Sequence, residues 1–596
     1  MRDLTRFAPH SVELETRADG AILMRSNTRL SPYAETTGAW LDHWAETAPD
    51  RVFIAERQGD GWREVTYAQA RDQVRGLAGW LLAQGFQRGQ IVACLSANGV
   101  DHGLLVLAAQ YIGLASTSVA EQYSLIPGAH ERLAHVVETA RPALIYVDDA
   151  ARYGAALDLE VVQGIPVLAS DAGGRDVSVF AEAAAHGTEG VDAAHDAVGP
   201  ETLAKVLFTS GSTSQPKAVM TTHRMMCVNQ AQLAAAFPLL TQKVHTIVDW
   251  LPWNHVFGGS HNFNMMLAHG GAIYIDDGKP TDTLFARTIE NLKLKTGTLS
   301  FNVPVGYAKL NEALKADKAL REQFFSGLDL MFYAGASLPQ EVWQGLEDMG
   351  VEVNGEPPYF ISSWGMTETS PCTVLVHERV RRSGIIGVPV PEVEVKLIRE
   401  EENRYELRVK GPNIMPGYLD APEKTAESFD AEGYLITGDA VRFVDRDDPD
   451  RGLAFDGRIS EDFKLTSGTW VRVAAIRAGV MTALDGLVGD VVITGHDRNE
   501  LGALLVPAVP VNGGEGEVVR DPDMLAQIRE RLANLAATST GSSTRVGRAL
   551  VMAEPPSLTQ AEMTAKGNIN IRKLLTRRAD LVERLYAGAD PAVIEV

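Results

Sequence analysis

The sequence predicts an α/β protein of two unequal parts, a large N-terminal domain of β-sheets covered by helices and a small α+β C-terminal domain. Amphipathic helical patterns alternate with short β-branched runs through most of the chain, which is typical of parallel sheets covered by helices. At 596 residues the chain is too long for one compact core. The composition changes near 454–468, after a charged, turn-rich stretch. We therefore predict domains at 1–459 and 460–596.

Individual segments carry the patterns behind this prediction. Residues 66–85 have the amphipathic period of a helix, which Gly85 would end. The longest uncharged stretch, 103–120, approaches membrane-spanning length, but Gln110 and Gly113 divide it into a buried helix followed by a strand. Other strands are predicted at 90–96, 141–149, 165–171, 270–276 and 490–496, and another helix at 523–536.

The charge balance and the cysteine content exclude several classes of function. The chain carries 55 basic and 77 acidic residues, so its surface repels nucleic acid and anionic lipid, and we expect neither as a partner. Cys94, Cys227 and Cys372 are odd in number and widely spaced, which argues against a disulfide framework or a zinc site. The charged N-terminal segment lacks the apolar region of a signal peptide. Together these features predict a cytoplasmic protein.

A loop rich in hydroxyl groups, within LFTSGSTSQPKAV (207–219), is the first candidate functional site. The apolar run 203–208 before it is typical of a buried strand, and ligands of open α/β sheets bind at the carboxyl ends of strands. Backbone N–H groups and hydroxyls of the loop could hold phosphate oxygens, with Lys217 as a point charge. The spacing differs from the common P-loop because no glycine precedes Lys217. The alternative interpretation is a mobile linker.

The loop resembles the phosphate-binding signature of the adenylate-forming superfamily, which comprises acyl-CoA synthetases, luciferases and the adenylation domains of peptide synthetases. Ser214 and Ala218 stand where relatives usually have glycine. Further segments resemble the other signatures of that family, in family order, over roughly residues 40 to 580. They are LPWNHVFG (251–258), YAGASL (333–338), SWGMTETSP (363–371), YLITGDAV (434–441), FDGRISEDFKL (455–465) and LTQAEMTAKGNINIRK (558–573).

The resemblance implies an ATP site assembled from several of these segments. The turn at 333–338 would flank the adenine, with Trp364 packed beside it. Asp439 would bind the ribose hydroxyls, with Arg458 nearby. Carried over residue by residue, the implied ATP and AMP contacts are Thr209, Ser210, Gly211, Ser212, Thr213, Lys217, Gly335, Ala336, Ser337, Trp364, Gly365, Met366, Thr367, Asp439 and Arg458.

The chemistry implied by the resemblance activates a carboxylic acid in two steps, with ATP, Mg²⁺ and coenzyme A. The carboxylate attacks the α-phosphate of ATP, pyrophosphate leaves, and the thiol of coenzyme A then displaces AMP from the acyl-adenylate. Because the first step brings two anions together, it needs preorganised positive charge. Lys566 would bridge the two anions, His255 would lie near the carboxylate and Thr367 would contact the α-phosphate; these are the implied catalytic residues. Glu368 is the implied ligand of Mg²⁺.

The second step needs a different wall of the site, so the resemblance also implies that the small C-terminal domain is mobile. Glu461 would be the pivot, and Lys464 and Gly468 would face coenzyme A after the rotation. The sequence departs from the family here. One extra residue lies between Lys464 and Gly468, and Val473 and Ala475 stand where many relatives have Pro and Glu.

Several phrases are more similar to one branch, the bacterial feruloyl-CoA synthases. This similarity implies a 4-hydroxycinnamic acid such as ferulate, p-coumarate or caffeate as the substrate. The predicted acid pocket comprises Trp253, His255, Phe257 and Gly335, and Phe263 could also enclose a flat ring. The same aromatic residues could equally line a core. The phrases lie at 249–263, 301–307, 324–338 and 455–471.

Other functions remain open on the sequence alone. The acid could be another aryl acid or a fatty acid, the acceptor could be a carrier protein, or the enzyme could be a luciferase-like oxygenase. A protein that binds adenylates without catalysis would be expected to lack Lys566 or Glu368, and both are present. Taken singly, Asp439 could be a turn residue and Glu368 a solvated surface acid. The expected partners are an aromatic acid, ATP and coenzyme A, and the chain is expected to be a monomer or a homodimer.

Overall fold

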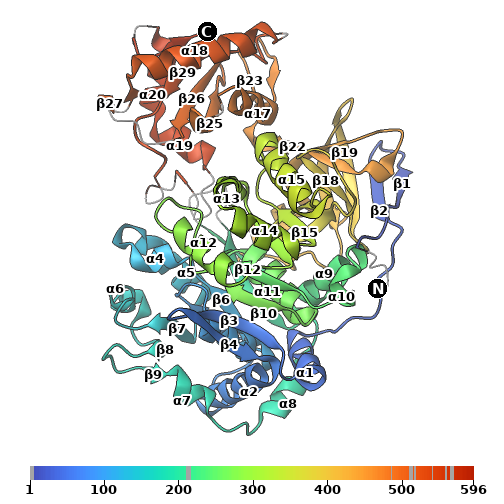
Figure 1. The fold of residues 1–596 in the computed structure, drawn as a ribbon, viewed down its shortest axis with the longest axis vertical. Helices are drawn as coiled ribbons and strands as arrows, with labels where there is room; N and C mark the ends of the chain where they lie inside the picture. The colour runs from blue at the N-terminus through green and yellow to red at the C-terminus, as the bar shows by residue number, and fades with distance from the viewer. Residues whose placement is uncertain are drawn as a thin grey trace.

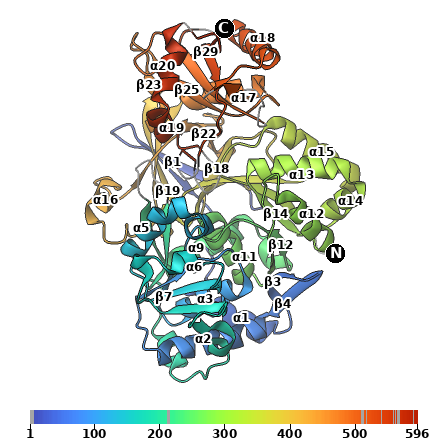
Figure 2. The ribbon, with the colours of Figure 1, turned by 90° about the vertical axis from the view of Figure 1, so that its left-hand side faces the viewer.

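The computed structural model confirms the α/β class and a large N-terminal part followed by a smaller C-terminal part. It describes residues 6–209, 216–484, 486–508, 514–515, 518–539, 541–557, 560, 562–563, 569–588 and 590–596. Figures 1 and 2 show the segments that follow strand β22 (Leu453–Arg458) as a separate body at one end of the molecule. The boundary at 459/460 stays a prediction. Within the described ranges, every helix is too short or too polar to traverse a lipid bilayer.

A seven-stranded sheet in the order β11-β10-β6-β5-β7-β8-β9 carries the hydroxyl-rich loop. Its strands pair in parallel except β10 with β11, which are antiparallel. The structure confirms the strands predicted at 90–96, 141–149 and 165–171, and the buried helix and strand predicted within 103–120. The bounds are β5 (Ile91–Cys94), α3 (Val100–Tyr111), β6 (Ala115–Ser118), β7 (Leu144–Asp149), β8 (Val167–Asp171), β9 (Ser178–Val179), β10 (Leu203–Thr209) and β11 (Lys217–Thr222).

A second, four-stranded sheet has the order β12-β13-β3-β4, and it shares one hydrophobic core with the seven-stranded sheet. Helix α2 (Tyr67–Ala83) packs in this core and confirms the helix predicted at 66–85. It begins with a capping box, in which Thr66 Oγ1 accepts from Gln69 N–H and the Gln69 side chain accepts from Thr66 N–H. The strands are β3 (Val52–Gln58), β4 (Gly61–Thr66), β12 (Thr246–Asp249) and β13 (Ala272–Ile275), which confirms the strand predicted at 270–276.

An eleven-stranded sheet, in the order β1-β2-β19-β20-β21-β22-β18-β17-β16-β15-β14, supplies most of the predicted site residues. Strands β14, β15 and β16 are parallel, so their carboxyl ends meet at one edge. The other pairings are antiparallel. The bounds are β1 (Val12–Thr16), β2 (Ile22–Ser26), β14 (Leu299–Asn302), β15 (Leu330–Tyr333), β16 (Phe360–Gly365), β17 (Cys372–Leu375), β18 (Ile385–Pro389), β19 (Glu394–Glu401), β20 (Arg404–Lys410) and β21 (Leu435–Phe443).

Helices cover these sheets and bury their apolar side chains. Trp343 of α15 (Gln340–Asn354), for example, is fully buried and stacks on Phe360 of β16, with 4.3 Å between ring centres. The remaining helices of this part are α1 (Thr37–Thr47), α4 (Glu121–Leu125), α5 (His130–Ala140), α6 (Gly154–Leu157), α7 (Phe180–Ala184), α8 (Val191–Asp196), α9 (His223–Ala236), α10 (Leu239–Gln242), α11 (Phe263–Ala268), α12 (Phe285–Leu294), α13 (Pro304–Ala316), α14 (Lys318–Ser326) and α16 (Pro422–Glu427).

The C-terminal part has its own sheet, β25-β26-β29-β30, and its own buried clusters. The strand predicted at 490–496 and the helix predicted at 523–536 are confirmed as β25 and α18. The bounds are β23 (Phe463–Lys464), β24 (Trp470–Val471), α17 (Val473–Ala483), β25 (Val488–Thr494), β26 (Leu501–Pro507), β27 (Gly514–Glu515), β28 (Val518–Val519), α18 (Pro522–Ala537), β29 (Val546–Val551), α19 (Ile571–Arg577), α20 (Ala579–Ala587) and β30 (Ile594–Glu595).

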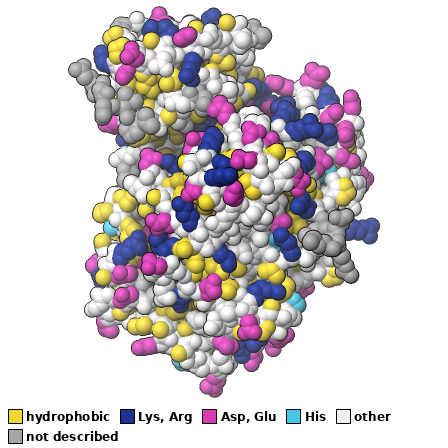
Figure 3. Space-filling model, viewed as in Figure 1, with side chains coloured by type: hydrophobic (Ala, Val, Ile, Leu, Met, Phe, Trp, Pro, Cys, Tyr) yellow, Lys and Arg dark blue, Asp and Glu magenta, His cyan; other side chains and the backbone are white. Residues whose placement is uncertain are grey.

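Acidic and basic side chains are interspersed on the face drawn in Figure 3, over both parts of the chain. Many of them are paired. Lys396, for example, has its Nζ 3.0 Å from Asp430 and 2.7 Å from Glu432. Because the whole chain has a formal charge of −22, the positive charge that an anionic ligand needs must come from a few local side chains.

A buried arginine fastens the segment between the two parts. Arg404 of β20 is 4% exposed and donates to Glu400, Asp456 and Asp462 at 2.6 to 2.9 Å. The side chain of Asp462 is 3% exposed and also accepts from Arg472 at 3.0 Å. Two cations therefore hold one buried carboxylate at the start of the C-terminal part, which compensates the cost of removing it from water.

Removal of this arginine should cost far more than removal of an exposed one nearby. Arg404→Ala should lower the free energy of unfolding by about 3–5 kcal/mol, because it removes a buried cation from three carboxylates and leaves the buried Asp462 with Arg472 alone. Arg442 is the matched control, because its side chain is 42% exposed and reaches Asp456 only at 3.6 Å. Arg442→Ala should cost about 1 kcal/mol or less. If urea unfolding gives the same loss of unfolding free energy for Arg404→Ala and Arg442→Ala, Arg404 does not have this stabilising role.

Candidate active site

The strand before the hydroxyl-rich loop ends at the position predicted from the sequence. β10 ends at Thr209, β11 begins at Lys217, and these two residues are partners in the antiparallel pair. The ammonium group of Lys217 lies 4.8 Å from the centre of the Tyr418 ring. The phosphate contacts of the loop itself stay predictions, because four of the residues lie outside the described ranges: Ser210, Gly211, Ser212 and Thr213.

Tyr418 connects this strand pair to the predicted Mg²⁺ ligand. Its hydroxyl donates to Glu368 Oε1 at 2.9 Å, and its backbone pairs with Val219 of β11. Burial and the Glu368 charge raise the pKa of the Tyr418 phenol, so it remains a donor. Glu368 lies in the 3-10 turn η4 (Thr367–Thr369) and is 5% exposed. The interpretation of Glu368 as a solvated surface acid is therefore wrong.

The donors around Glu368 fit a cation that is shared with phosphate. Mg²⁺ is usually held by one or two carboxylates together with substrate phosphates rather than by an all-protein cage. Within the described ranges, no group of three His, Cys, Asp or Glu side chains could hold a metal alone. The neighbouring Thr367 is also buried. One buried carboxylate is compatible with an ion that is shared with phosphate, and the role of Glu368 toward Mg²⁺ stays a prediction.

Asp439 is the centre of a second group of predicted contacts. It lies within β21, is 7% exposed, and pairs with Arg458 of β22. The indole N–H of Trp364 donates to Asp439 Oδ2 at 2.8 Å, and Arg458 Nε lies 3.5 Å from Oδ1. The interpretation of Asp439 as a simple turn residue is therefore wrong, because the residue lies in a strand and receives contacts from two other strands.

The second carboxylate oxygen of Asp439 is suited to a ligand. Oδ1 is buried and has no hydrogen-bond partner among the described residues. A buried polar atom without a partner costs about 1–3 kcal/mol. Burial raises the pKa of Asp439, while Arg458 and the Trp364 N–H act in the opposite direction. Ribose hydroxyls are donors that would satisfy this oxygen, so the residues present fit the nucleotide that the sequence implies.

The turn predicted to flank the adenine follows β15, where the parallel strands end. Gly335, Ala336 and Ser337 are exposed, and Gly335 has φ +90°, a conformation that favours glycine. Ser383 Oγ accepts from Leu338 N–H at 2.8 Å and fixes the end of the turn. The turn is therefore open to solvent at the same sheet edge at which Trp364 lies.

Gly365 and Met366 connect Trp364 to the 3-10 turn. A Cβ at Gly365 would lie 1.8 Å from the carbonyl oxygen of Pro371, so no larger residue fits without a shift of the backbone. Met366 N–H donates to Thr369 Oγ1 at 3.0 Å. These two contacts hold the segment in a tight bend that places Thr367 and Glu368 after the end of β16.

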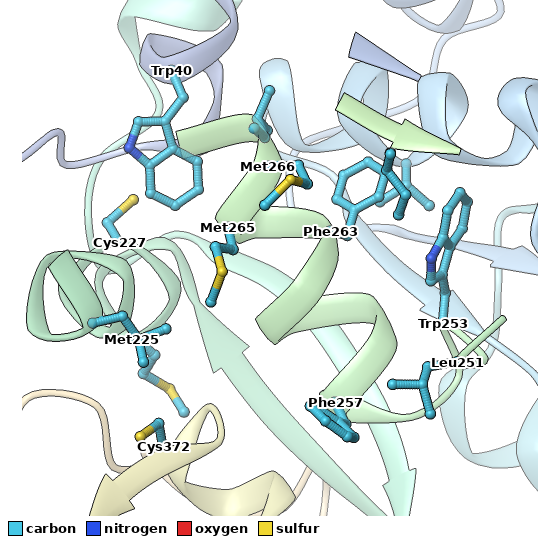
Figure 4. Packing of buried hydrophobic residues seen from close by; sticks show 14 of the residues in the cluster. Trp40, Met225, Cys227, Leu251, Trp253, Phe257, Phe263, Met265, Met266 and Cys372 are labelled. Atoms are coloured by element: carbon cyan, nitrogen blue, oxygen red, sulfur yellow. The ribbon is translucent and has the colours of Figure 1, made fainter. Parts of the chain in front are cut away.

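The predicted acid pocket does not form as one group of rings. Trp253 packs on Phe263, with 5.0 Å between ring centres, and Phe257 packs on Phe332 at 5.8 Å. Figure 4 shows Trp253 beside Phe263, and Phe257 apart from them at the lower end of the helical segment. The alternative that the aromatic residues line a core thus holds for Trp253 and Phe263. His255 is half-buried, and its Nδ1 accepts from Phe257 N–H at 3.3 Å.

The helical segment that starts at Phe257 is a π-helix, η3 (Phe257–Asn262). Lys205 of β10 donates to the carbonyl of Gly259, and Gln230 Nε2 donates to the carbonyls of Ser260 and His261 at 3.3 and 3.4 Å. Burial lowers the pKa of Lys205 to about 7. Side chains therefore bond the carbonyls of this irregular turn, and π-helical turns often occur at functional sites.

The proposed hinge and coenzyme A residues lie at the start of the C-terminal part. Glu461 ends the 3-10 turn η6 (Ile459–Glu461), and burial raises its pKa while Arg458 and Arg477 oppose the shift. Lys464 lies with its ammonium 4.9 Å from the Trp470 ring, and Gly468 has φ +78°. Their roles toward coenzyme A stay predictions.

The predicted catalytic lysine lies outside the described residues. Lys566 belongs to 564–568, and its role stays a prediction. The flanking residues Met563 and Ile569 pair as an antiparallel bridge. The carboxylate of the nearby Glu562 is buried and accepts from Arg578 at 2.8 and 2.9 Å.

Two residues that organise the site, Tyr418 and Lys205, are not among those predicted from the sequence, and only Lys205 has a signal in the sequence. Tyr418 follows a Pro-Gly pair, and nothing in the pattern links it to Glu368, 50 residues earlier. Lys205 gave a detectable signal, because it is a charged residue inside the apolar run 203–208. Buried charges are costly and usually have a specific partner, here the carbonyl of Gly259.

Loss of the Asp439 carboxylate should weaken ATP binding. Asp439→Ala should raise the ATP concentration for half-maximal pyrophosphate release about 10- to 100-fold, the value of a charge-assisted hydrogen bond. Because the folded-state pKa of Asp439 is raised, the wild-type carboxylate is protonated at a higher pH than an ordinary aspartate, so ATP affinity should fall as pH falls through that pKa. Asp439→Asn should lack this dependence. The exposed Asp447→Ala is the control, and an unchanged ATP requirement in folded Asp439→Ala would contradict the role.

Comparisons with known proteins agree with this arrangement. The family model described as AMP-binding enzyme matches residues 41–419, and the AMP-binding enzyme C-terminal domain matches 464–590. A 7a-methyl-1,5-dioxo-octahydro-1H-inden-4-yl propanoyl:CoA ligase of Rhodococcus jostii is 26% identical over 80% of this chain and 89% of its own length. A 3-hydroxybenzoate--CoA ligase of Aromatoleum is 27% identical over 76% of this chain and 82% of its own length.

A solved structure, ATP-bound MatB from Rhodopseudomonas palustris, has the same fold. Its TM-score is 0.71 at 20% identity, over 92% of this chain and 99% of that one. The resemblance to the adenylate-forming superfamily is confirmed, and the likeness to feruloyl-CoA synthases stays a prediction. Because its family model covers more than half of the residues, this chain belongs to the AMP-binding enzyme family.

Proposed function

We propose that the chain is an ATP- and Mg²⁺-dependent acid–CoA ligase that forms an acyl-adenylate and then an acyl-CoA thioester from a hydroxycinnamic acid such as ferulate. The observation that carries the proposal is the buried carboxylate of Asp439: one oxygen accepts from Trp364, and the other faces the Arg458 guanidinium at 3.5 Å but accepts no hydrogen bond from the described residues. A nucleoside supplies the hydroxyl donors that this oxygen needs. Family membership and the CoA ligases among the relatives support the reaction class.

The residues divide the first step among themselves. Asp439, which Trp364 orients, binds the ribose, and the open turn at Gly335 receives the adenine beside Trp364. Lys217 and Thr367 contact phosphate oxygens, and Glu368 keeps its carboxylate oriented through Tyr418. The carboxylate of the acid attacks the α-phosphorus, the bond to pyrophosphate breaks, and Lys566 balances the charge that the two anions bring together. Mg²⁺, when bound, neutralises phosphate charge.

The second step transfers the acyl group to sulfur. The thiolate of coenzyme A attacks the acyl carbon, the bond to the phosphate oxygen breaks, and AMP leaves with the electron pair. We propose that the C-terminal part rotates at Glu461 to bring Lys464 and Gly468 to the thiol. Cys94, Cys227 and Cys372 are buried free thiols, which fits a reducing compartment such as the cytoplasm.

An aromatic acid is supported by the rings beside the open turn. Phe257, Phe301 and Phe332 form a cluster with ring centres 5.5 to 6.3 Å apart. Phe332 lies in β15, which leads to the turn at Gly335, and Phe301 lies in the parallel neighbour β14. The hydroxybenzoate–CoA ligase among the relatives is consistent with this choice.

A panel of acids tests the proposal. Purified protein is incubated with ATP, Mg²⁺, coenzyme A and one acid at a time, and AMP and acyl-CoA are measured. We expect ferulate, p-coumarate and caffeate to have kcat/KM values at least roughly 10-fold above those of octanoate and dodecanoate, the difference of about 1.4 kcal/mol that a few aromatic contacts supply. A preference for the fatty acids would contradict the hydroxycinnamate assignment, and AMP formation without any thioester would contradict the ligase assignment.

The role of Lys566 is tested by separating the two steps. Lys566→Ala should slow adenylate formation by roughly 100-fold or more, because it removes a preorganised positive charge. It should leave thioester formation from a supplied acyl-adenylate within about 3-fold of wild type, because the lysine would act only in the first step. Lys573→Ala is the control on the same C-terminal segment. Near-normal pyrophosphate release by Lys566→Ala would refute the assignment.

A further inference from the structure

A fully buried histidine lies inside the aromatic cluster. His261 of the π-helix has 0% exposure, and its ring centre lies 4.9 Å from that of Phe332, 5.5 Å from Phe257 and 5.6 Å from Phe301. Aromatic neighbours of this kind can pack against an imidazole but cannot satisfy both of its nitrogens. The hydrogen bonds of the two nitrogens therefore decide what this residue can do.

A chain of hydrogen bonds fixes the tautomer of His261. Asn262 Nδ2 donates to Asp249 Oδ2 at 3.0 Å, so the other atom of that amide, Oδ1, is an acceptor. His261 Nδ1 lies 2.8 Å from Asn262 Oδ1 and must therefore carry the proton of this hydrogen bond. Asp249 in turn accepts from Leu251 N–H at 3.2 Å, which holds the carboxylate in place.

The other nitrogen of His261 is then a bare acceptor. Burial lowers the pKa of His261 to about 4, so the ring is neutral at pH 7 and Nε2 carries a lone pair. Nε2 is buried and has no hydrogen-bond partner among the described residues. Native proteins rarely leave such an atom unpaired, because its desolvation is then not compensated.

The position of this acceptor relates it to the turn at Gly335. Phe301 and Phe332 precede Asn302 and Tyr333, the last residues of β14 and β15, and Ala334 N–H donates to Asn302 O at 3.4 Å. A Cβ at Gly335 would have only Val303 Cγ1 nearby, at 4.0 Å, so the space over this turn is open. Phe332 lies only three residues before Gly335, so a flat ring that binds over this turn would approach the cluster that surrounds His261.

We propose that His261 Nε2 accepts a hydrogen bond from a hydroxyl group on the ring of the acid, so that the chain selects hydroxylated aromatic acids over their unsubstituted analogues. This inference rests on the proposed function. A neutral acceptor enclosed by ring faces favours a neutral O–H donor, since a second acceptor would be repelled and an ammonium group would have to shed its water. The reacting carboxylate then lies at the opposite end of the substrate, toward the phosphates.

The hydrogen bonds from His261 through Asn262 to Asp249 explain why Nε2, and not Nδ1, would accept from the hydroxyl group of the acid. Asp249, Asn262 and His261 are all buried and are connected by hydrogen bonds in that order. A site built to bond a hydroxyl rejects an analogue that lacks it, because its own polar atom stays unpaired. The π-helical backbone, held by Gln230, positions the imidazole.

The experiment compares acids that differ only in the hydroxyl group. For the wild-type enzyme we expect kcat/KM of p-coumarate to exceed those of cinnamate and 4-methylcinnamate about 10- to 100-fold, the effect of pairing one buried acceptor. His261→Phe should lose most of this preference, by lowering the p-coumarate value and leaving the cinnamate value unchanged or higher. His102→Phe is the matched control, because His102 is also buried but both of its nitrogens are bonded, to Ala97 O and Ser118 Oγ.

The outcomes separate this inference from the proposed function. If the wild-type enzyme activates the three acids equally, or if folded His261→Phe keeps the hydroxyl preference, His261 does not read the hydroxyl and its Nε2 bonds water instead. If no aromatic acid is activated at all, the proposed function fails with it. Should His261→Phe not fold, equal kcat/KM values for p-coumarate and 4-methylcinnamate in the wild-type enzyme would still overturn the inference, because the two acids differ in the donor and hardly in size. The smaller variant His261→Leu would then show whether the preference depends on the imidazole.

Discussion

The site depends on one buried carboxylate that the protein only half satisfies. Burial of Asp439 disfavours its charged form. In place of water, the protein provides one hydrogen bond from Trp364 and the guanidinium of Arg458 at 3.5 Å. Three strands meet to supply these groups: β16 carries the indole, β21 the carboxylate and β22 the arginine. β21 and β22 are neighbours in the large sheet, whereas β18 and β17 lie between β22 and β16, so the Trp364–Asp439 hydrogen bond joins strands that are not neighbours.

The same principle recurs where the acid would bind. In an ordinary α-helix the backbone carbonyls accept hydrogen bonds from the N–H groups of the same helix. In this π-helix some carbonyls accept instead from side chains of other elements, namely Lys205 and Gln230. Burying these polar groups costs free energy unless they are paired, and the pairing fixes the rotation of the segment. Under the proposed function, the ribose and the ring of the acid would each meet a buried polar atom that has no hydrogen-bond partner among the described residues, Asp439 Oδ1 and His261 Nε2.

The sequence predicted what depends on local pattern. Alternating helices and strands gave the α/β class, and the apolar run 203–208 gave the strand before the hydroxyl-rich loop, because both are set by burial over a few residues. The aromatic segment was less informative. Trp253, Phe257 and Phe263 are close in sequence, yet Trp253 and Phe263 pack together in the core while Phe257 contacts β15. Side-chain direction there follows from the π-helical turn, which the spacing of apolar residues does not encode.

Contacts between distant segments were beyond the sequence for the same reason. Tyr418 with Glu368, and Arg404 with Asp462, join residues 50 and 58 positions apart. The second pair constrains the proposed hinge. Arg404 and Asp462 are almost fully buried, whereas Arg472 and Glu401 form an ion pair with side chains 27% and 53% exposed.

Opening an exposed ion pair costs little because water replaces the partner, and separating a buried one is expensive. A rotation of the C-terminal part would therefore exchange the Arg472–Glu401 contact for solvent at little cost, whereas Asp462, which accepts from both Arg404 and Arg472, would have to lose one of the two. If the more deeply buried Arg404 keeps Asp462, this residue stays on the fixed side. The backbone change would then fall just after it, one residue beyond the predicted pivot Glu461 and before the hairpin that begins at Phe463.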